Sequence, residues 1–140
     1  MTAEEMWLAG GLEGEYEAWC FGGDPGGLAE LVRSGKKTAT ASAFACYEAE
    51  GESLPRAGEY SVILDSRDEA VCVIKTAKVY ITQLKDVTED HARKEGEGDL
   101  SLGYWREVHR DFFTGELAEI GLPFSEDMSV VCEEFELVYP

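Results

Sequence analysis

The chain of 140 residues is poor in basic residues. It carries 12 Lys and Arg against 29 Asp and Glu, which gives a formal net charge of -17 at pH 7. Because tight binding of nucleic acid depends on cations that neutralise phosphates, an acidic chain has to gather its few cations in one place to hold RNA. The densest such place holds Arg33, Lys36 and Lys37. The charge therefore favours a small substrate and still allows the binding of a short RNA. It gives no reason to expect DNA binding.

Paired cysteines and long apolar runs are also missing. The four cysteines lie far apart, at Cys20, Cys46, Cys72 and Cys132. They form no CxxC pair, so the spacing of a structural zinc site is missing, and we expect neither a metal nor another cofactor. Glutamates interrupt the first twelve residues, which therefore do not read as a signal peptide. No run approaches the ~20 apolar residues of a membrane-spanning helix. We therefore expect a cytoplasmic protein with reduced cysteines and no membrane contact.

The length fits a single domain over residues 1–140. Residues 2–19 read as a helix with a ragged apolar stripe, so we expect an N-terminal helical extension over about residues 1–26. The middle third changes to the two-residue period of strands, which predicts an antiparallel hairpin or meander over residues 60–64, 70–74 and 79–82. A last strand is expected over residues 129–139, with its core-facing side chains at Val131, Phe135, Leu137 and Tyr139.

Four more helices are expected, over residues 27–34, 43–50, 86–95 and 100–113. Gly35 and Gly96 stand where a left-handed residue commonly ends a helix. Asp86 and Glu89 have the spacing of a capping box, and Asp99 is a candidate N-cap for the helix that follows it. The pattern as a whole predicts an α+β fold.

Lys37 and Thr40 form a candidate catalytic pair. A lysine acts as a base near neutral pH only when burial or an adjacent cation lowers its pKa, and Lys36 is an adjacent cation. The Thr40 hydroxyl, three residues on, becomes nucleophilic once a base removes its proton. A structural explanation also fits: Arg33, Lys36 and Lys37 would complement the carboxyl end of helix 27–34, and Thr40 would be an ordinary strand residue.

Glu95 is expected in the last turn of helix 86–95, where the helix dipole is negative. A carboxylate there has a raised pKa unless a cation is close, and Lys37 is the cation we expect. Glu97 and Asp99 add two carboxyl groups, but the spacing does not match an EF-hand and the ligands are too few for a metal site.

Two aromatic groups are candidates for a pocket wall. Trp19 and Phe21 flank a glycine-rich loop, and Trp105 and His109 stand one helical turn apart. Each group fits core packing as well as the binding of a planar ligand. The second histidine, His91, has no partner visible in the sequence.

Several motifs together resemble one family. The segment Gly-Lys-Lys-Thr-Ala-Thr at 35–40 resembles the GxKxxT element near the start of ASCH domains, which have a PUA-like β-barrel with flanking helices. Four further segments are similar to the longer, YhfF-like branch: the aromatic-Gly-Asp-Pro segment at 19–25, Glu-Ala-Glu-Gly at 48–51, Glu-Gly-Glu-Gly-Asp at 95–99, and Ser-Leu-Gly-Tyr-Trp-Arg-Glu-Val-His at 101–109. The resemblance covers nearly the whole chain.

The resemblance implies a site and an activity. ASCH proteins are proposed RNA-associated modules, and some are amidohydrolases that remove the acyl group from N4-acetylcytidine with a Lys, a Thr three residues on, and a Glu. The matching residues here are Lys37, Thr40 and Glu95. Around them we expect substrate-binding residues at Phe21, Lys36, Ser42, Tyr47, Asp99, Trp105 and His109. Ser42 stands where an Arg often stands in the short amidohydrolase branch.

Two other functions use the same residues. The chain could be a non-catalytic module that binds a modified nucleoside or a short RNA, with lysines on phosphate and aromatic rings on bases. It could also be a ribonuclease with the same Lys and hydroxyl cluster.

Overall fold

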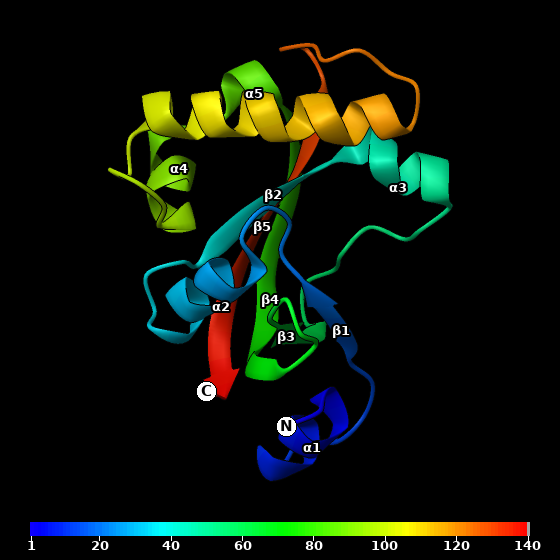
Figure 1. The fold of residues 1–140 in the computed structure, drawn as a ribbon, viewed down its shortest axis with the longest axis vertical. Coiled ribbons are helices and arrows are strands. Elements are labelled where there is room, and N and C mark those ends of the chain that lie inside the picture. Colours follow the sequence, from blue (N-terminus) through cyan, green and yellow to red (C-terminus); the bar gives the residue numbers. More distant parts are fainter. Residues whose placement is uncertain (140) are drawn as a thin grey trace.

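The structure is a computed structural model that describes residues 1–139. Its centre is a five-stranded sheet in the order β1-β3-β4-β5-β2, which curls into a half-barrel (Figure 1). The strands are β1 (Glu17–Cys20), β2 (Ala39–Ala43), β3 (Tyr60–Leu64), β4 (Ala70–Gln83) and β5 (Ser129–Tyr139). β1 runs parallel to β3, and the other neighbours are antiparallel. The predicted α+β fold with a mainly antiparallel, barrel-like sheet is confirmed.

Within residues 1–139, five α-helices and one 3-10 turn surround the sheet. They are α1 (Ala3–Ala9), α2 (Pro25–Arg33), α3 (Phe44–Glu50), η1 (Leu84–Asp86), α4 (Glu89–Glu95) and α5 (Leu102–Glu119). α5 lies across one end of the sheet with α3 and α4 close to it, and α1 lies at the other end (Figure 1). The expected left-handed residues are present, with φ 82° at Gly35 after α2 and φ 70° at Gly96 after α4.

The hydrophobic core covers both faces of the sheet. Val62 and Ile63 are adjacent in β3, so their side chains point to opposite faces, and both are fully buried. Val62 packs in a cluster with α1, whereas Ile63 packs in a cluster with α2. A third cluster fills the space between α5 and strands β2 and β5. Helices on both faces explain why the alternating pattern of residues 60–64 has no exposed side.

The N-terminal segment differs from the expectation. The helix predicted over residues 2–19 ends at Ala9, and residues 17–20 form β1 instead. Gly11 and Gly14 both have positive φ, which interrupts the helix. β1 then gains backbone hydrogen bonds along β3, with Trp19 opposite Ile63. The predicted extension therefore contributes a strand to the central sheet.

Four smaller expectations were also wrong. The N-cap of α4 is Thr88 rather than Asp86, and the N-cap of α5 is Ser101 rather than Asp99. α5 continues to Glu119, beyond the predicted end at residue 113. Leu137, expected in the core, is 39% exposed and lies at a register shift in the pairing of β4 with β5. Among residues 1–139, no helix combines the length and apolar character needed to cross a bilayer.

Candidate functional site

A cleft of about 900 Å³ opens beside the sheet. Its walls come from β1, β2, α3, the end of α4 and one side of α5. The predicted site residues that line it are Phe21, Lys37, Thr40, Ser42, Tyr47, Glu95 and His109. Segments that are far apart in the sequence therefore meet around one space large enough for a nucleoside-sized ligand.

The start of β2 is fixed against the end of α4. The Thr38 backbone N–H donates to the Lys94 carbonyl oxygen at 2.7 Å, and the Thr38 hydroxyl donates to the same oxygen at 3.3 Å. Gly96 makes this approach possible, because a Cβ at that position would lie 2.2 Å from the carbonyl oxygen of Lys36. This contact directs the side chain of Lys37 toward α4.

Lys37 is 2% exposed and has three acceptors around its ammonium group. Nζ lies 3.3 Å from the Glu95 carbonyl oxygen, 3.3 Å from Glu95 Oε1 and 3.1 Å from Glu97 Oε2. It also lies 5.4 Å from the centre of the Phe21 ring, within the range of a cation–π contact. The number of acceptors matches the three N–H donors of a lysine.

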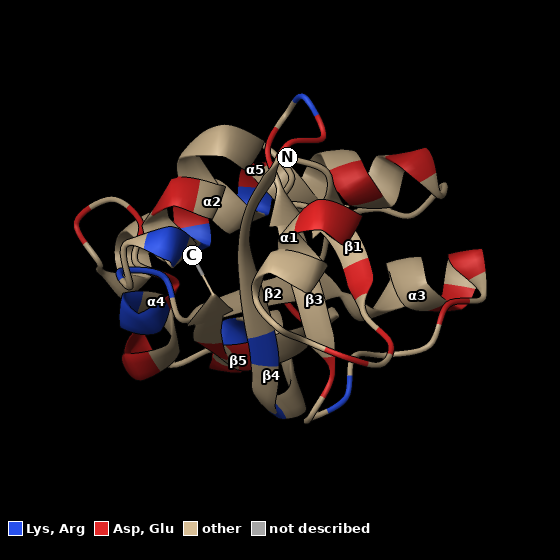
Figure 2. Cartoon of the chain, turned by 90° about the horizontal axis from the view of Figure 1, so that it is seen from below, with Lys and Arg blue, Asp and Glu red and all other residues tan. Residues whose placement is uncertain are grey.

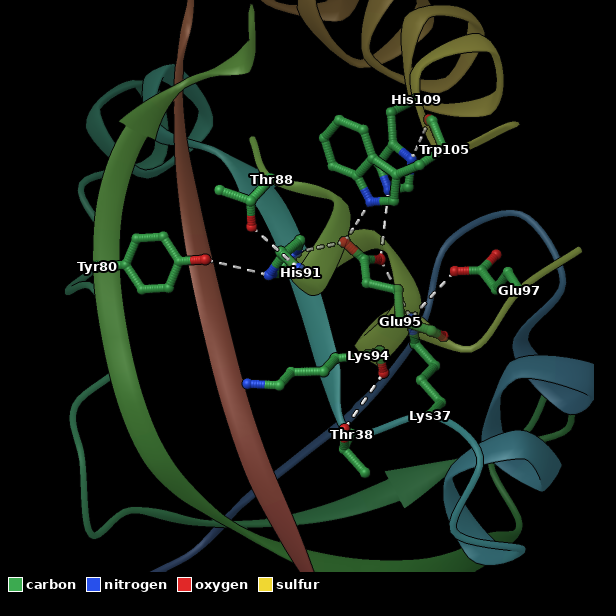
Figure 3. A network of polar contacts seen from close by, with 10 residues as sticks. All are labelled: Lys37, Thr38, Tyr80, Thr88, His91, Lys94, Glu95, Glu97, Trp105 and His109. Carbon is green, nitrogen blue, oxygen red and sulfur yellow. Dashed lines mark hydrogen bonds and ion pairs between the residues drawn. The ribbon is translucent and has the colours of Figure 1, made fainter. Parts of the chain in front are cut away.

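Glu95 is 2% exposed and is the centre of the polar network in Figure 3. Its Oε2 accepts from Trp105 Nε1 at 2.6 Å and lies 2.7 Å from His91 Nε2. Its Oε1 faces Lys37 and lies 3.4 Å from His109 Nε2. Both oxygens of the buried carboxylate are thus surrounded by donors from three parts of the chain.

The groups around Glu95 determine the charge of its carboxyl group. Burial acts to raise the pKa of the carboxyl group, but the hydrogen bonds from His109 and His91 and the charge of Lys37 outweigh it. The net result is a pKa far below the ordinary value. The expectation that a cation would relieve Glu95 at the helix end holds, with two histidines beside Lys37.

The two histidines are oriented by their second ring nitrogens. His91 Nδ1 lies 3.3 Å from the Tyr80 hydroxyl, and His109 Nδ1 donates to the Trp105 carbonyl oxygen at 2.8 Å. The Trp105 and His109 rings stack with their centres 4.0 Å apart. His91, for which the sequence showed no partner, has one four residues on at Glu95, a spacing that places both on one helix face.

The opposite wall of the cleft carries hydroxyl groups. Thr40 and Ser42 alternate along β2 and therefore share a face. Ser42 Oγ lies 2.8 Å from the Tyr47 hydroxyl on α3, within hydrogen-bond distance. Among residues 1–139, the Thr40 hydroxyl has no hydrogen-bond partner. Thr40 is therefore free to meet a ligand.

Glu133 on β5 is a cleft residue that the sequence reading missed. It is 7% exposed, pairs with Thr40 across the strands, and its Oε2 accepts from the Thr76 hydroxyl at 2.9 Å. A signal was present, because Glu133 lies between Val131 and Phe135 at the two-residue period of the predicted core face.

Three predicted binding residues lie outside the cleft lining. Lys36 and Asp99 are exposed, and Asp99 accepts from the Ser101 backbone N–H at 2.9 Å. Trp105 is buried behind Glu95, so its indole N–H serves the network and its ring packs in the core. The sequence could not separate these positions from their neighbours, because exposure depends on how α4 and α5 pack.

The cleft is strongly acidic. Of the described residues that line it, Lys37 supplies the one ammonium group, and the carboxyl groups are those of Glu17, Asp24, Glu52, Glu59, Glu95, Glu97, Glu116 and Glu133. Figure 2 shows acidic segments along β1 and α3, which border the cleft. Phosphate groups would meet repulsion here, whereas neutral or cationic ligands would not.

Comparison with known proteins identifies the family. The sequence model of the ASCH domain matches residues 17–139. The crystal structure of an ASCH domain from Lactobacillus crispatus JV V101 is similar, with 36% identity, a TM-score of 0.85, and coverage of 89% of this chain and 81% of that one. This chain therefore belongs to the ASCH domain family, and its fold is of the PUA-like type.

Two other structures are similar. Protein EF3133 from Enterococcus faecalis V583, of the family DUF984, is 38% identical with a TM-score of 0.87, over 97% of this chain and 85% of that one. The hypothetical protein PH0355 is 16% identical with a TM-score of 0.55, over 87% of this chain and 97% of that one, and supports the fold alone. No curated protein matches the chain.

Proposed function

We propose that this ASCH protein is an amidohydrolase that removes the acyl group from an N4-acylated cytidine or a related modified nucleoside. The observation that carries the proposal is one cleft that contains a buried lysine, a buried carboxylate 3.3 Å from it, and a threonine hydroxyl without a protein partner. A nucleophile, a base and a group that orients the base are the parts that covalent acyl transfer needs. The resemblance of residues 35–40 to acyl-removing ASCH proteins supplies the substrate class.

In the proposed reaction, Lys37 is the base and Thr40 the nucleophile. This scheme requires Lys37 to act as the neutral amine. Lys37 takes the hydroxyl proton of Thr40, whose oxygen bonds to the acyl carbon. The proton moves from Lys37 to the leaving nitrogen as the carbon–nitrogen bond breaks, and the cytidine departs. Water hydrolyses the acyl-threonine ester and restores the hydroxyl.

Glu95 orients Lys37 in this scheme. Its strongly lowered pKa makes it a poor proton donor, so protonation of the leaving nitrogen falls to Lys37. Its buried carboxylate holds Nζ at 3.3 Å on the cleft wall. A residue that acts this way changes the rate without touching the substrate.

The charge of the cleft supports a small neutral substrate over RNA. Its carboxyl groups repel a phosphate backbone, and Lys36, the cation expected to help hold phosphate, lies outside the cleft lining. If the RNA-binding alternative held, RNA affinity would fall steeply with salt and would be lost in Lys36→Ala.

Incubation with N4-acetylcytidine and a panel of acylated nucleosides, followed by mass spectrometry, tests the proposal. We expect turnover by the wild-type protein and a loss of at least about 100-fold in Lys37→Ala and Thr40→Ala. Lys36→Ala is the matched control, because it changes the neighbouring lysine outside the cleft. The proposal fails if the wild type turns over none of the panel or if both cleft variants keep full activity.

A further inference from the structure

Glu133 is the carboxyl group of the cleft that the proposed reaction does not use. It projects from β5 and is 7% exposed. Its Oε2 accepts from the Thr76 hydroxyl at 2.9 Å, whereas its Oε1 has no hydrogen-bond partner within residues 1–139. No buried side-chain oxygen or nitrogen of the described residues lacks a partner, so the unpaired Oε1 is accessible from the cleft. A buried carboxyl with one open oxygen on a cleft is therefore suited to a ligand.

The position of Glu133 relative to Thr40 is set by the sheet. The two residues are direct partners in the antiparallel pairing of β2 and β5. Directly opposed residues in such a pair place their Cβ atoms about 4.5–5.5 Å apart on one face of the sheet. A ligand held by Glu133 consequently lies beside the Thr40 hydroxyl.

The surroundings of Glu133 raise the pKa of its carboxyl group. Burial raises the pKa of the group, the Thr76 hydroxyl opposes that rise, and the charges of Glu59 and Glu17 add to it. Tyr47 faces Glu133 from α3, and Lys37 stands elsewhere on the cleft wall, already bonded to Glu95 and Glu97. A neutral carboxylic acid offers one O–H donor and retains acceptor capacity on its other oxygen.

We propose that Glu133 determines specificity by pairing with the edge of an N4-acylated cytosine, donating from Oε1 to ring nitrogen N3 and accepting the amide N4–H on Oε2. This inference rests on the proposed function and names the group that recognises its substrate. Oε2 has two lone pairs, so it accepts from N4–H while it keeps the bond from Thr76. The acyl group on N4 then lies beside Thr40, because Glu133 and Thr40 are cross-strand partners.

Binding measured without turnover tests the inference separately from catalysis. In a Thr40→Val background, calorimetry compares N4-acetylcytidine with its 3-deaza analogue, in which a C–H replaces N3. We expect N4-acetylcytidine to bind about 10- to 100-fold more tightly, because the analogue leaves the Glu133 donor unpaired. Adding Glu133→Ala removes the preference. Adding Glu133→Gln keeps it, since the amide also offers one donor and one acceptor on this edge.

The matched control and the pH response sharpen the test. Glu134→Gln changes the next residue, whose carboxylate binds Lys94 at 3.0 Å, and leaves the preference intact. The preference falls as pH rises and Glu133 ionises, whereas in Glu133→Gln it does not change with pH. Equal binding of the two nucleosides, or a preference that survives Glu133→Ala, overturns the inference. Turnover by the wild-type protein reports on the proposed function independently, so the two failures are distinct.

Discussion

The two walls of the cleft differ in how completely their polar atoms are bonded. One wall, here called the α4 wall, consists of Lys37 and the end of α4, and every polar side-chain atom of Lys37 and Glu95 has a bonding partner there. On the sheet wall, the Thr40 hydroxyl and Glu133 Oε1 have no partner within residues 1–139. A fully bonded wall holds its groups in one geometry, and an open wall leaves hydrogen-bonding capacity for a ligand. The bonded groups therefore fix the geometry of the site, and the unbonded groups are the ones available to the substrate.

The two buried carboxyl groups also differ in the direction of their pKa. Two histidines and Lys37 overcome the effect of burial at Glu95 and lower its pKa. Thr76 alone opposes burial at Glu133, and its pKa is raised. The pKa values of these two buried carboxyl groups, which are 2% and 7% exposed, therefore shift in opposite directions because their partners differ.

Removing Glu95 should have the largest effect on stability. Glu95→Ala leaves Lys37, His91 and Trp105 with unpaired buried donors, so we expect a loss of about 3–5 kcal/mol in the free energy of unfolding. Urea unfolding followed by circular dichroism measures it. Glu30→Ala is the control, since its ion pair with Arg33 is exposed and should contribute little to stability. Equally small losses of unfolding free energy in both variants would show that the hydrogen bonds of Glu95 do not stabilise the fold.

Gly96→Ala should have the next largest effect on the free energy of unfolding, because the added Cβ would push α4 away from the segment that carries Lys37. Its Cβ meets the Lys36 carbonyl oxygen and its φ is +70°. Gly11→Ala is the matched control, with φ +69° and open space around the Cβ, and should cost about 1–2 kcal/mol from backbone strain alone. We expect Gly96→Ala to cost at least ~1 kcal/mol more by urea unfolding. Equal costs would show that the close backbone approach adds nothing.

The pH dependence of stability should have opposite signs at the two carboxyl groups. The stabilisation from Glu95, whose folded pKa is lowered, is complete above its ordinary value of 4.5 and is lost as pH falls through the folded pKa. The stabilisation from Glu133, whose folded pKa is raised, is present below 4.5 and is lost as pH rises through the folded pKa.

Unfolding measured from pH 4 to pH 8 checks this sign. The stability of Glu133→Gln relative to the wild type should rise as pH increases from 4.5, because the wild-type carboxyl group ionises more readily in the unfolded chain and the amide does not titrate. Glu134→Gln is the matched control, since it changes the neighbouring carboxyl group of β5, which lies close to Lys94 and Lys78. A relative stability of Glu133→Gln that falls with pH would reverse the assignment.

The smallest effect on stability is expected at Thr40. Thr40→Ala removes a hydroxyl without a partner in residues 1–139, so the free energy of unfolding should change by ~1 kcal/mol or less. Thermal unfolding measures this change. A loss of several kcal/mol would mean that the hydroxyl is a structural group, and the sheet wall would then resemble the α4 wall.

Part of the site could be predicted from the sequence. Lys37 and Thr40 are close in the chain, and Glu95 is marked by its place in the last turn of a helix that ends at Gly96. These residues can be identified from local sequence because glycine conformation and helix ends depend on neighbouring residues in the chain. Trp105 and Glu133 could not be assigned in the same way, because their contacts join segments distant in the chain.

The sequence by itself determined the α+β pattern, most helix ends and the pair of residues at the start of β2. These features depend on local backbone preference and on the period of apolar residues. The tertiary structure decided that residues 17–20 join the sheet, that Trp105 bonds to Glu95, and that Glu133 faces Thr40. Strand pairing and burial arise from contacts between distant segments, and those contacts give two similar carboxyl groups opposite pKa shifts.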